Sequence, residues 1–433
     1  MKWSMFIFKV EADGKVLLYN TFNYAVVLFE QDVFNKIDAM VNNGLLDESE
    51  EVKALIEQEF LISKIIDEKE QFMQILKAEH DDDSRMCLQI LTTTGCNFKC
   101  PYCYQEGICR EERISLETIR MLEVFLEKYI SKNNKIKKIF LILHGGEPTT
   151  NWKHVPEIFE MIHRICEKFT LDYDTQIITN GYLLTKEKID LLVANNLRNV
   201  QITIDGIGKI TDMRRAARNG VPTFDTIISN IHKLLETNTK GKVRIRINYD
   251  KQNAVCVSET IEFLAKEFAD ERVEVTLGYI TKTMDTLESN PYIDQYGIQL
   301  SELVDYYPEF HRKLREAGYT PENLLIFDGL CVSKMKHNMV ISPSGEIYKC
   351  PSGVGIHEFV EGNIHNGEEK VRDYLFYKLY DYCFEEKCPF IPLCQTSCRF
   401  LAAAKNGAID SIDCKREALE KVNIKLLKDQ YMT

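Results

Sequence analysis

The sequence lacks any long apolar stretch. No segment approaches the roughly 20 apolar residues that a membrane-spanning helix needs. A short apolar run near the N-terminus is interrupted by Glu11 and Asp13, and no small-residue cleavage site follows it. These absences argue against a membrane partner and a secretory signal, and they predict a cytoplasmic protein.

The chain also lacks an excess of basic residues. It has 54 Lys and Arg against 66 Asp and Glu, which gives a net charge of −12. Nucleic acids and anionic membranes are bound through basic surface, so we expect neither as the main partner. A content of 45% hydrophobic and 28% charged residues is typical of a soluble globular protein with a sizeable core.

Cysteine is abundant, with 14 residues in 433. Disulfides are rare in the cytoplasm, so a metal role is the better expectation for the clustered thiols. Ten of the cysteines fall into two groups, one within residues 96–103 and one within residues 331–414. The other four are scattered, and most of them are expected to be small buried hydrophobes.

Strand and helix patterns alternate from about residue 85 onward. Apolar runs typical of strands occur six times, at 86–93, 138–144, 175–180, 199–204, 243–249 and 273–279. Helical patterns fall between them, at about 115–130, 155–169, 186–194, 223–236 and 257–267. This alternation predicts an α/β fold with a parallel sheet, a partial (β/α)6 TIM-like barrel over residues 85–300. In such a barrel the active residues lie at the C-terminal ends of the strands. The segments TTTGC, HGGEPTT, TNG and DG follow the first four strands.

The regions on either side of the barrel have different patterns. Residues 1–84 contain two strands around a turn at Asp13-Gly14, followed by two helical stretches, which is a winged-helix-like pattern. A charged linker, EHDDDSR, ends this module. Residues 301–433 begin with a helix, then become rich in cysteine and turns, with little core of their own. A small segment of this kind usually needs metal to fold.

The first cysteine group is Cys96, Cys100 and Cys103. A structural zinc site usually needs four protein ligands, whereas an iron–sulfur cluster held by three thiolates keeps one iron free for another ligand. The segment CNFKCPYCY resembles the signature of radical S-adenosylmethionine (SAM) enzymes. The resemblance implies a [4Fe-4S] cluster that chelates SAM, a 5′-deoxyadenosyl radical that abstracts hydrogen, and an external electron donor of flavodoxin or ferredoxin type.

Further residues carry the same resemblance, which extends over about residues 88–280. HGGEP resembles the GGEP motif of the family, in which the glycines allow close backbone approach and the glutamate pairs with the SAM ammonium. In DGIGKITDMRR, the resemblance assigns the SAM carboxylate to Arg215 in preference to Arg214. A capping or turn role is the alternative for each polar residue taken singly. The SAM contacts implied in this way are Tyr102, Gly145, Gly146, Glu147, Thr179, Asn180, Thr203, Asp205 and Arg215.

The second cysteine group resembles a SPASM domain, the C-terminal extension of many radical SAM enzymes that modify peptides. The resemblance assigns Cys383, Cys388, Cys394 and Cys414 to a distal auxiliary [4Fe-4S] cluster, and Cys331, Cys350 and Cys398 to a proximal one. The spacing from Cys383 to Cys388 departs from the family pattern, with four intervening residues in place of two. No cysteine lies just upstream of Cys331 to complete the proximal cluster, so we expect an open iron or a non-cysteine ligand there. A zinc ribbon is the structural alternative.

The predicted substrate is a ribosomally made precursor peptide with a leader. The N-terminal module resembles leader-recognition domains that bind a leader as an added β-strand. An open proximal cluster favours a thioether cross-link, while carbon–carbon or carbon–oxygen links stay open. The first alternative is a sulfatase-maturase-like enzyme that forms formylglycine. That group carries an aspartate after the cysteine of its Gly-x4-Cys motif, where this chain has Pro351. The second alternative is a non-catalytic iron–sulfur electron-transfer protein.

Overall fold

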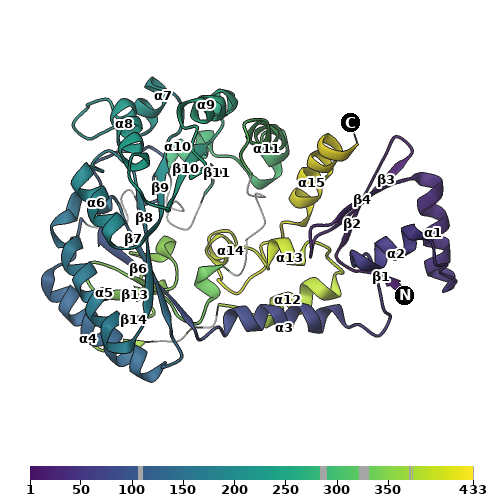
Figure 1. The fold of residues 1–433 in the computed structure, drawn as a ribbon, viewed down its shortest axis with the longest axis horizontal. Coiled ribbons are helices and arrows are strands. Elements are labelled where there is room, and N and C mark those ends of the chain that lie inside the picture. The colour runs from purple at the N-terminus through teal and green to yellow at the C-terminus, as the bar shows by residue number, and fades with distance from the viewer. Residues whose placement is uncertain (106–110, 283–289, 321–330, 370–371, 373, 433) are drawn as a thin grey trace.

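A computed structural model describes residues 1–105, 111–282, 290–320, 331–369, 372 and 374–432. It shows an α/β fold built on a curved sheet, with a small N-terminal module at the far side of the C-terminal region (Figure 1). Among the described residues, no helix is both long and apolar enough to cross a bilayer.

The main sheet has ten strands in the order β11-β10-β9-β8-β7-β6-β12-β13-β14-β15. Strands β6 to β11 pair in parallel with a helix between most neighbours, so the predicted partial barrel is confirmed. The six strands are β6 (Arg85–Thr93), β7 (Lys138–Gly145), β8 (Asp172–Thr179), β9 (Leu197–Thr203), β10 (Lys242–Tyr249) and β11 (Val273–Tyr279). The helices of the repeat are α4 (Leu116–Lys132), α5 (Val155–Phe169), α6 (Lys186–Ala194), α7 (Lys209–Arg214), α8 (Phe224–Leu235) and α9 (Ala254–Glu267).

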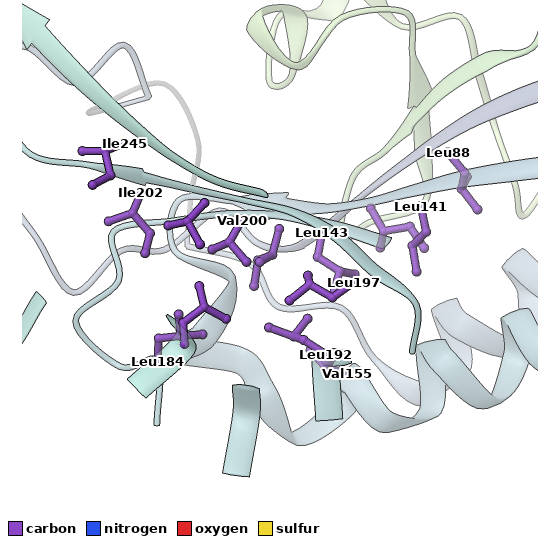
Figure 2. Packing of buried hydrophobic residues seen from close by; sticks show 14 of the residues in the cluster. Leu88, Leu141, Leu143, Val155, Leu184, Leu192, Leu197, Val200, Ile202 and Ile245 are labelled. Atoms are coloured by element: carbon purple, nitrogen blue, oxygen red, sulfur yellow. The ribbon is translucent and has the colours of Figure 1, made fainter. Parts of the chain in front are cut away.

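The core lies between the strands and these helices. Alternate residues of a strand point to opposite faces, and in β7 Leu141 and Leu143 are fully buried on the helix side. Figure 2 shows these leucines packed towards Leu192 of α6 and Val155 of α5. The alternating residues, which include His144, therefore face the hollow of the barrel. This inner side is partly polar, which suits a binding cavity better than a filled core.

The N-terminal module contains a three-stranded antiparallel sheet, ordered β2-β3-β4, that turns at Asp13-Gly14 as predicted. One face of the sheet packs on helices of its own module. The second helical stretch ends at Glu57, and Leu61–Ile62 beyond it pairs with Lys2–Trp3. The elements are β1 (Lys2–Trp3), β2 (Ile7–Ala12), β3 (Lys15–Asn20), β4 (Val26–Glu30), α1 (Gln31–Asn43), α2 (Glu50–Glu57), β5 (Leu61–Ile62) and α3 (Glu68–His80).

The other face of the N-terminal sheet packs on the C-terminal region. Phe8 of β2 lies 4.8 Å from Phe390, measured between ring centroids, and Leu419 and Leu427 belong to the same cluster. The two modules at the ends of the sequence therefore share a core, although nothing in the sequence pattern indicated this contact.

The C-terminal region also joins the main sheet. Strand β12 (Asn338–Ile341) pairs in parallel with β6, so the sheet continues past the predicted boundary near residue 300. The short hairpin strands are β13 (Glu346–Tyr348), β14 (Gly362–Asn363) and β15 (Glu368–Glu369). The helices are α10 (Pro291–Tyr296), α11 (Tyr307–Glu316), α12 (Tyr377–Glu385), α13 (Ile391–Cys394), α14 (Arg399–Asn406) and α15 (Arg416–Tyr431), with 3-10 turns at η1 (Pro148–His154), η3 (Leu300–Asp305), η4 (Val332–Lys334), η5 (Pro351–Gly353) and η6 (His357–Phe359).

Candidate active site and cysteine groups

The first cysteine group occupies the loop that leaves the C-terminal end of β6. The loop is held by a bridge between Phe98 and Ala217 and by a hydrogen bond from the Arg218 guanidinium to the carbonyl of Cys96. Burial, together with the charges of Glu147 and of the other two thiols of the group, raises the pKa of Cys96 to about 12. The three thiols therefore lie within electrostatic reach of one another. Cluster binding would have to deprotonate them.

The two glycines of HGGEP lie against the backbone of this loop. A Cβ on Gly145, which has φ of +148°, would lie 2.2 Å from the carbonyl oxygen of Thr93. A Cβ on Gly146 would lie 2.5 Å from the carbonyl oxygen of Gly95. Both positions require glycine, and what approaches them is the cysteine loop itself.

Glu147 is fully buried beneath the same loop. Its carboxylate accepts hydrogen bonds from the backbone N–H of Thr149 at 3.0 Å, the hydroxyl of Thr179 at 2.7 Å and the backbone N–H of Asn180 at 2.6 Å. Asn180 in turn donates to the side chain of Asn97 at 2.8 Å. The carboxylate therefore ties the ends of β7 and β8 to the cysteine loop.

Tyr102 and Asp205 meet at the end of β9. The Tyr102 hydroxyl donates to the Asp205 carboxylate and accepts from the Arg215 guanidinium at 2.9 Å. Burial raises the pKa of Asp205 above its ordinary value, and Arg215 and Arg214 oppose that shift. Burial opposes the charge on Arg215, but its neighbours, Cys100 among them, raise its pKa well above the ordinary value. The network thus reaches the second thiol of the loop.

Arg214 is used differently from Arg215. It makes paired hydrogen bonds to both oxygens of Asp250, at 3.1 and 2.9 Å, and a further one to Tyr292 at 2.6 Å. Its guanidinium also lies over the ring of Tyr102 at 5.1 Å. Arg214 is therefore engaged by the carboxylate of Asp250, whereas the thiol of Cys100 acts on the pKa of Arg215. The assignment of the SAM carboxylate to Arg215 stays a prediction.

Sequence reasoning missed Asp250 and Tyr292. Asp250 follows β10 directly, so the rule that found Asp205 at the end of β9 also applies to it. Tyr292 lies in α10, outside the repeat, and no local pattern indicates its contact with Asp250 at 2.9 Å.

The remaining predicted residue of the barrel, Thr203, ends β9 and is buried beside Asp205. Two buried polar atoms at this end of the sheet have no hydrogen-bond partner among the described residues: Asp205 Oδ1 and Arg215 Nε. Orphaned buried donors and acceptors of this kind normally mark a site that a polar ligand completes. The residues present therefore fit a charged, hydrogen-bonding ligand such as SAM.

The structure brings together thiols of the second cysteine group in two places. A cavity of about 90 Å³ is lined by Cys383, Cys388, Cys394 and Cys414, the four thiols assigned to the distal cluster. Burial raises the pKa of Cys350, and Cys398 and Cys331 raise it further, so the three thiols assigned to the proximal cluster are also neighbours. No three His, Cys, Asp or Glu side chains in the described part of the chain are arranged to hold a single metal ion.

A second cavity, of about 710 Å³, opens on the inner face of the barrel. Phe140 and Ile142 contribute apolar wall, and Gln176 and Asn199 contribute amide groups. Arg244 and Glu274 form a salt bridge there at 3.2 Å. Met335, four residues after Cys331, lines the same cavity, so the cavity reaches the segment that carries the first proximal cysteine.

Residues 90–264 match the family model described as the radical SAM superfamily. A GTP 3′,8-cyclase of Aliarcobacter butzleri is 26% identical over 56% of this chain and 69% of its own length. A cysteine-type anaerobic sulfatase-maturating enzyme of Clostridium novyi is 24% identical over 75% of this chain and 90% of its own. The mycofactocin maturase MftC of Mycobacterium tuberculosis is 24% identical over 65% of this chain and 68% of its own length. Over residues 90–264 the chain is therefore similar to enzymes of the radical SAM superfamily.

Two solved structures agree with the fold. anSMEcpe with bound AdoMet and the Cp18Cys peptide has a TM-score of 0.62 at 18% identity, over 80% of this chain and 99% of its own. SuiB of Streptococcus suis bound to precursor peptide SuiA has a TM-score of 0.53 at 16% identity, over 96% of this chain and 99% of its own. A match over 96% of the chain necessarily includes most of residues 1–84, so the likeness to SuiB extends to the N-terminal module.

Proposed function

We propose that the protein is a radical SAM maturase that binds the leader of a ribosomally made peptide and forms a cross-link in its core, with a thioether from a cysteine sulfur as the favoured product. The observation that carries the proposal is the N-terminal module. Its sheet ends in β4, which in the described residues pairs only with β3, so one edge is open to an added strand. SuiB, whose fold resembles this chain throughout, has been solved with a precursor peptide.

In this proposal Cys96, Cys100 and Cys103 hold a [4Fe-4S] cluster that leaves one iron for SAM. When bound, this cluster and SAM supply a 5′-deoxyadenosyl radical as the hydrogen-abstracting species. Arg215 and Asp205 supply opposite charges for the ionic ends of SAM, and Tyr102 fixes their spacing. Glu147 holds the loop and the strand ends together through its own hydrogen bonds, in addition to the ammonium contact inferred from the resemblance.

The seven C-terminal cysteines hold two auxiliary clusters in this proposal. Four thiols line one cavity there, and four cysteine thiolates are the usual ligands of a [4Fe-4S] cluster. Cys331, Cys350 and Cys398 then hold a proximal cluster with an iron open to a substrate thiolate. An external donor of flavodoxin or ferredoxin type supplies electrons.

Formylglycine formation in a sulfatase is the second candidate. It is favoured by the relative in Clostridium novyi and by the likeness to anSMEcpe. Pro351, which opens the turn η5 directly after Cys350, places no carboxylate at the position where that group of enzymes has its base. An electron-transfer protein without catalysis is a third candidate. It is disfavoured because such a protein needs no ligand for the unpartnered polar atoms of Asp205 and Arg215 near the cysteine loop.

The test is anaerobic reconstitution with iron and sulfide, then addition of SAM and dithionite. We expect 5′-deoxyadenosine by mass spectrometry, and about twelve irons per chain if three [4Fe-4S] clusters form. The matched control is the triple variant Cys96→Ala, Cys100→Ala, Cys103→Ala, which should keep the auxiliary iron and make no 5′-deoxyadenosine. A fully loaded wild-type protein that makes none would contradict radical chemistry.

The substrate is tested with peptides. A cysteine-containing precursor should lose two hydrogen atoms in mass and one titratable thiol if a thioether forms. A sulfatase peptide converted to an aldehyde that reacts with hydrazines would instead establish the second candidate.

A further inference from the structure

A buried lysine joins the segments that carry the two C-terminal groups of cysteines. Lys334 ends the turn η4, three residues after Cys331, and its side chain is only 3% exposed. Its ammonium donates to the carbonyl of Gln395 and lies 3.4 Å from the hydroxyl of Tyr380 and 5.6 Å from the centre of that ring.

No carboxylate forms a salt bridge with Lys334 within the described ranges of the chain. Burial lowers the pKa of its ammonium to about 8, and the neighbouring thiols oppose this. Those thiols are Cys331 and Cys398 of the proximal group and Cys394 of the distal group. The ammonium is therefore within electrostatic reach of both groups.

A second buried cation is close by. Arg399 is 1% exposed and donates to the carbonyls of Ser411 at 2.9 Å and Ile409 at 3.3 Å, and its Nε has no partner among the described residues. The nearby carboxylate of Asp413 is taken up by Lys405 at 2.9 Å and by Ser397 at 3.2 Å.

Two buried cations in this arrangement repel each other and have lost their hydration, which destabilises the folded protein unless anions compensate. Among the groups that shift the pKa of Lys334 most, those that favour its charged form are thiols. Thiolates in clusters carry the required negative charge permanently, because ligation deprotonates them. The two clusters would therefore supply negative charge that balances these buried cations.

We propose that Lys334 is a counter-ion shared by the two auxiliary clusters, and that its charge makes both of them easier to reduce. The inference rests on the proposed function, since it requires the seven cysteines to hold two clusters. One-electron reduction adds a negative charge to a cluster, and a fixed positive charge in a low-dielectric surrounding stabilises that form. Arg399 adds to the same field from the side of Cys398.

The test is a reductive titration of the reconstituted holoenzyme with dithionite, followed by electron paramagnetic resonance. Lys334→Met removes the charge, Lys334→Arg keeps it, and Lys378→Met, an exposed lysine of α12, is the matched control. We expect Lys334→Met to lower the potentials of both auxiliary clusters by at least 59 mV, a tenfold change in the ratio of oxidised to reduced cluster. The SAM-binding cluster should not shift, and the other two variants should match the wild type.

Several results would overturn the inference. One is an iron-replete Lys334→Met protein with unchanged auxiliary potentials, and another is an equal shift in Lys334→Arg. If Lys334→Met loses auxiliary iron, retention of that iron by Lys334→Arg supports the role of the positive charge. Loss of iron in both variants shows that only the shape of the side chain matters, and it overturns the inference. A wild type that makes 5′-deoxyadenosine without auxiliary clusters would remove this inference and leave the radical chemistry standing.

Discussion

Tyr102 is the residue that connects the cysteine loop to the charged groups at the end of β9. Its hydroxyl stands between Asp205 and Arg215, and hydrogen bonds to charged groups contribute about 1.5–3 kcal/mol. We expect Tyr102→Phe to weaken SAM binding by about tenfold or more, because the arginine and the carboxylate lose the group that sets their spacing. Equilibrium binding of SAM to reconstituted protein measures this. The exposed Tyr431→Phe serves as the control, and an unchanged affinity in Tyr102→Phe would remove Tyr102 from the binding site.

His144 supplies a pH-dependent contribution to stability. Burial lowers its pKa to about 4 from an ordinary 6.5, so the folded state binds this proton less readily than the unfolded state. Its contribution is therefore fully present above about pH 6.5 and is lost as the pH falls towards 4, a difference of about 3 kcal/mol.

The measurement is the melting temperature of anaerobic holoenzyme between about pH 7 and pH 5. Wild type should lose more thermal stability on acidification than His144→Gln, in which the titrating group is gone. His357→Gln, at an exposed position, should behave as wild type. Parallel curves for wild type and His144→Gln would show that His144 does not titrate between the two states.

At the scale of the element, the contact between β2 and α13 connects the N-terminal sheet to the distal cysteines. Phe8 packs on Phe390, which lies between Cys388 and Cys394 in the chain. We expect Phe8→Ala to destabilise the protein by about 3 kcal/mol and to lower the iron content of the distal site, because the cavity left behind relaxes only partly. Thermal melting and iron analysis check both. The control is Ile65→Ala, a side chain 92% exposed in the same module, and equal effects of the two changes would contradict the shared core.

The sequence predicted the barrel elements well because their apolar spacing is local. Strands β6 to β11 lie where the apolar runs placed them, and the loops after β6, β7, β8 and β9 carry the residues expected there. The pairing of β12 with β6 joins residues about 250 positions apart, and no pattern within either strand encodes it. For the same reason local patterns suggested Asp205 and Arg215, but they did not indicate that Tyr292 contacts Asp250. Family likeness grouped the C-terminal cysteines, but it did not indicate that Lys334 is buried beside their segments.

At the scale of the whole molecule, leader and core of a precursor would be bound at different places. The open edge of β4 belongs to the N-terminal module, whereas the predicted SAM site lies at the ends of the barrel strands (Figure 1). A leader held at the module raises the effective concentration of the attached core at the barrel, without any new contact at the reacting residue. A leaderless core should therefore show a much higher KM and an unchanged kcat, and free leader added separately should not restore the KM.

A charge on the open edge tests where the leader binds. Leu28 of β4 is 37% exposed, and Leu28→Lys should oppose strand addition, because charged side chains protect edge strands from pairing. We expect the KM for full precursor to rise severalfold with kcat retained, and the KM for leaderless core to stay unchanged. Ile65→Lys, an equally new charge elsewhere in the module, should change neither constant. A rise in KM for the leaderless core in Leu28→Lys would mean that the substitution acts on the barrel through the shared core, and it would argue against β4 as the leader site.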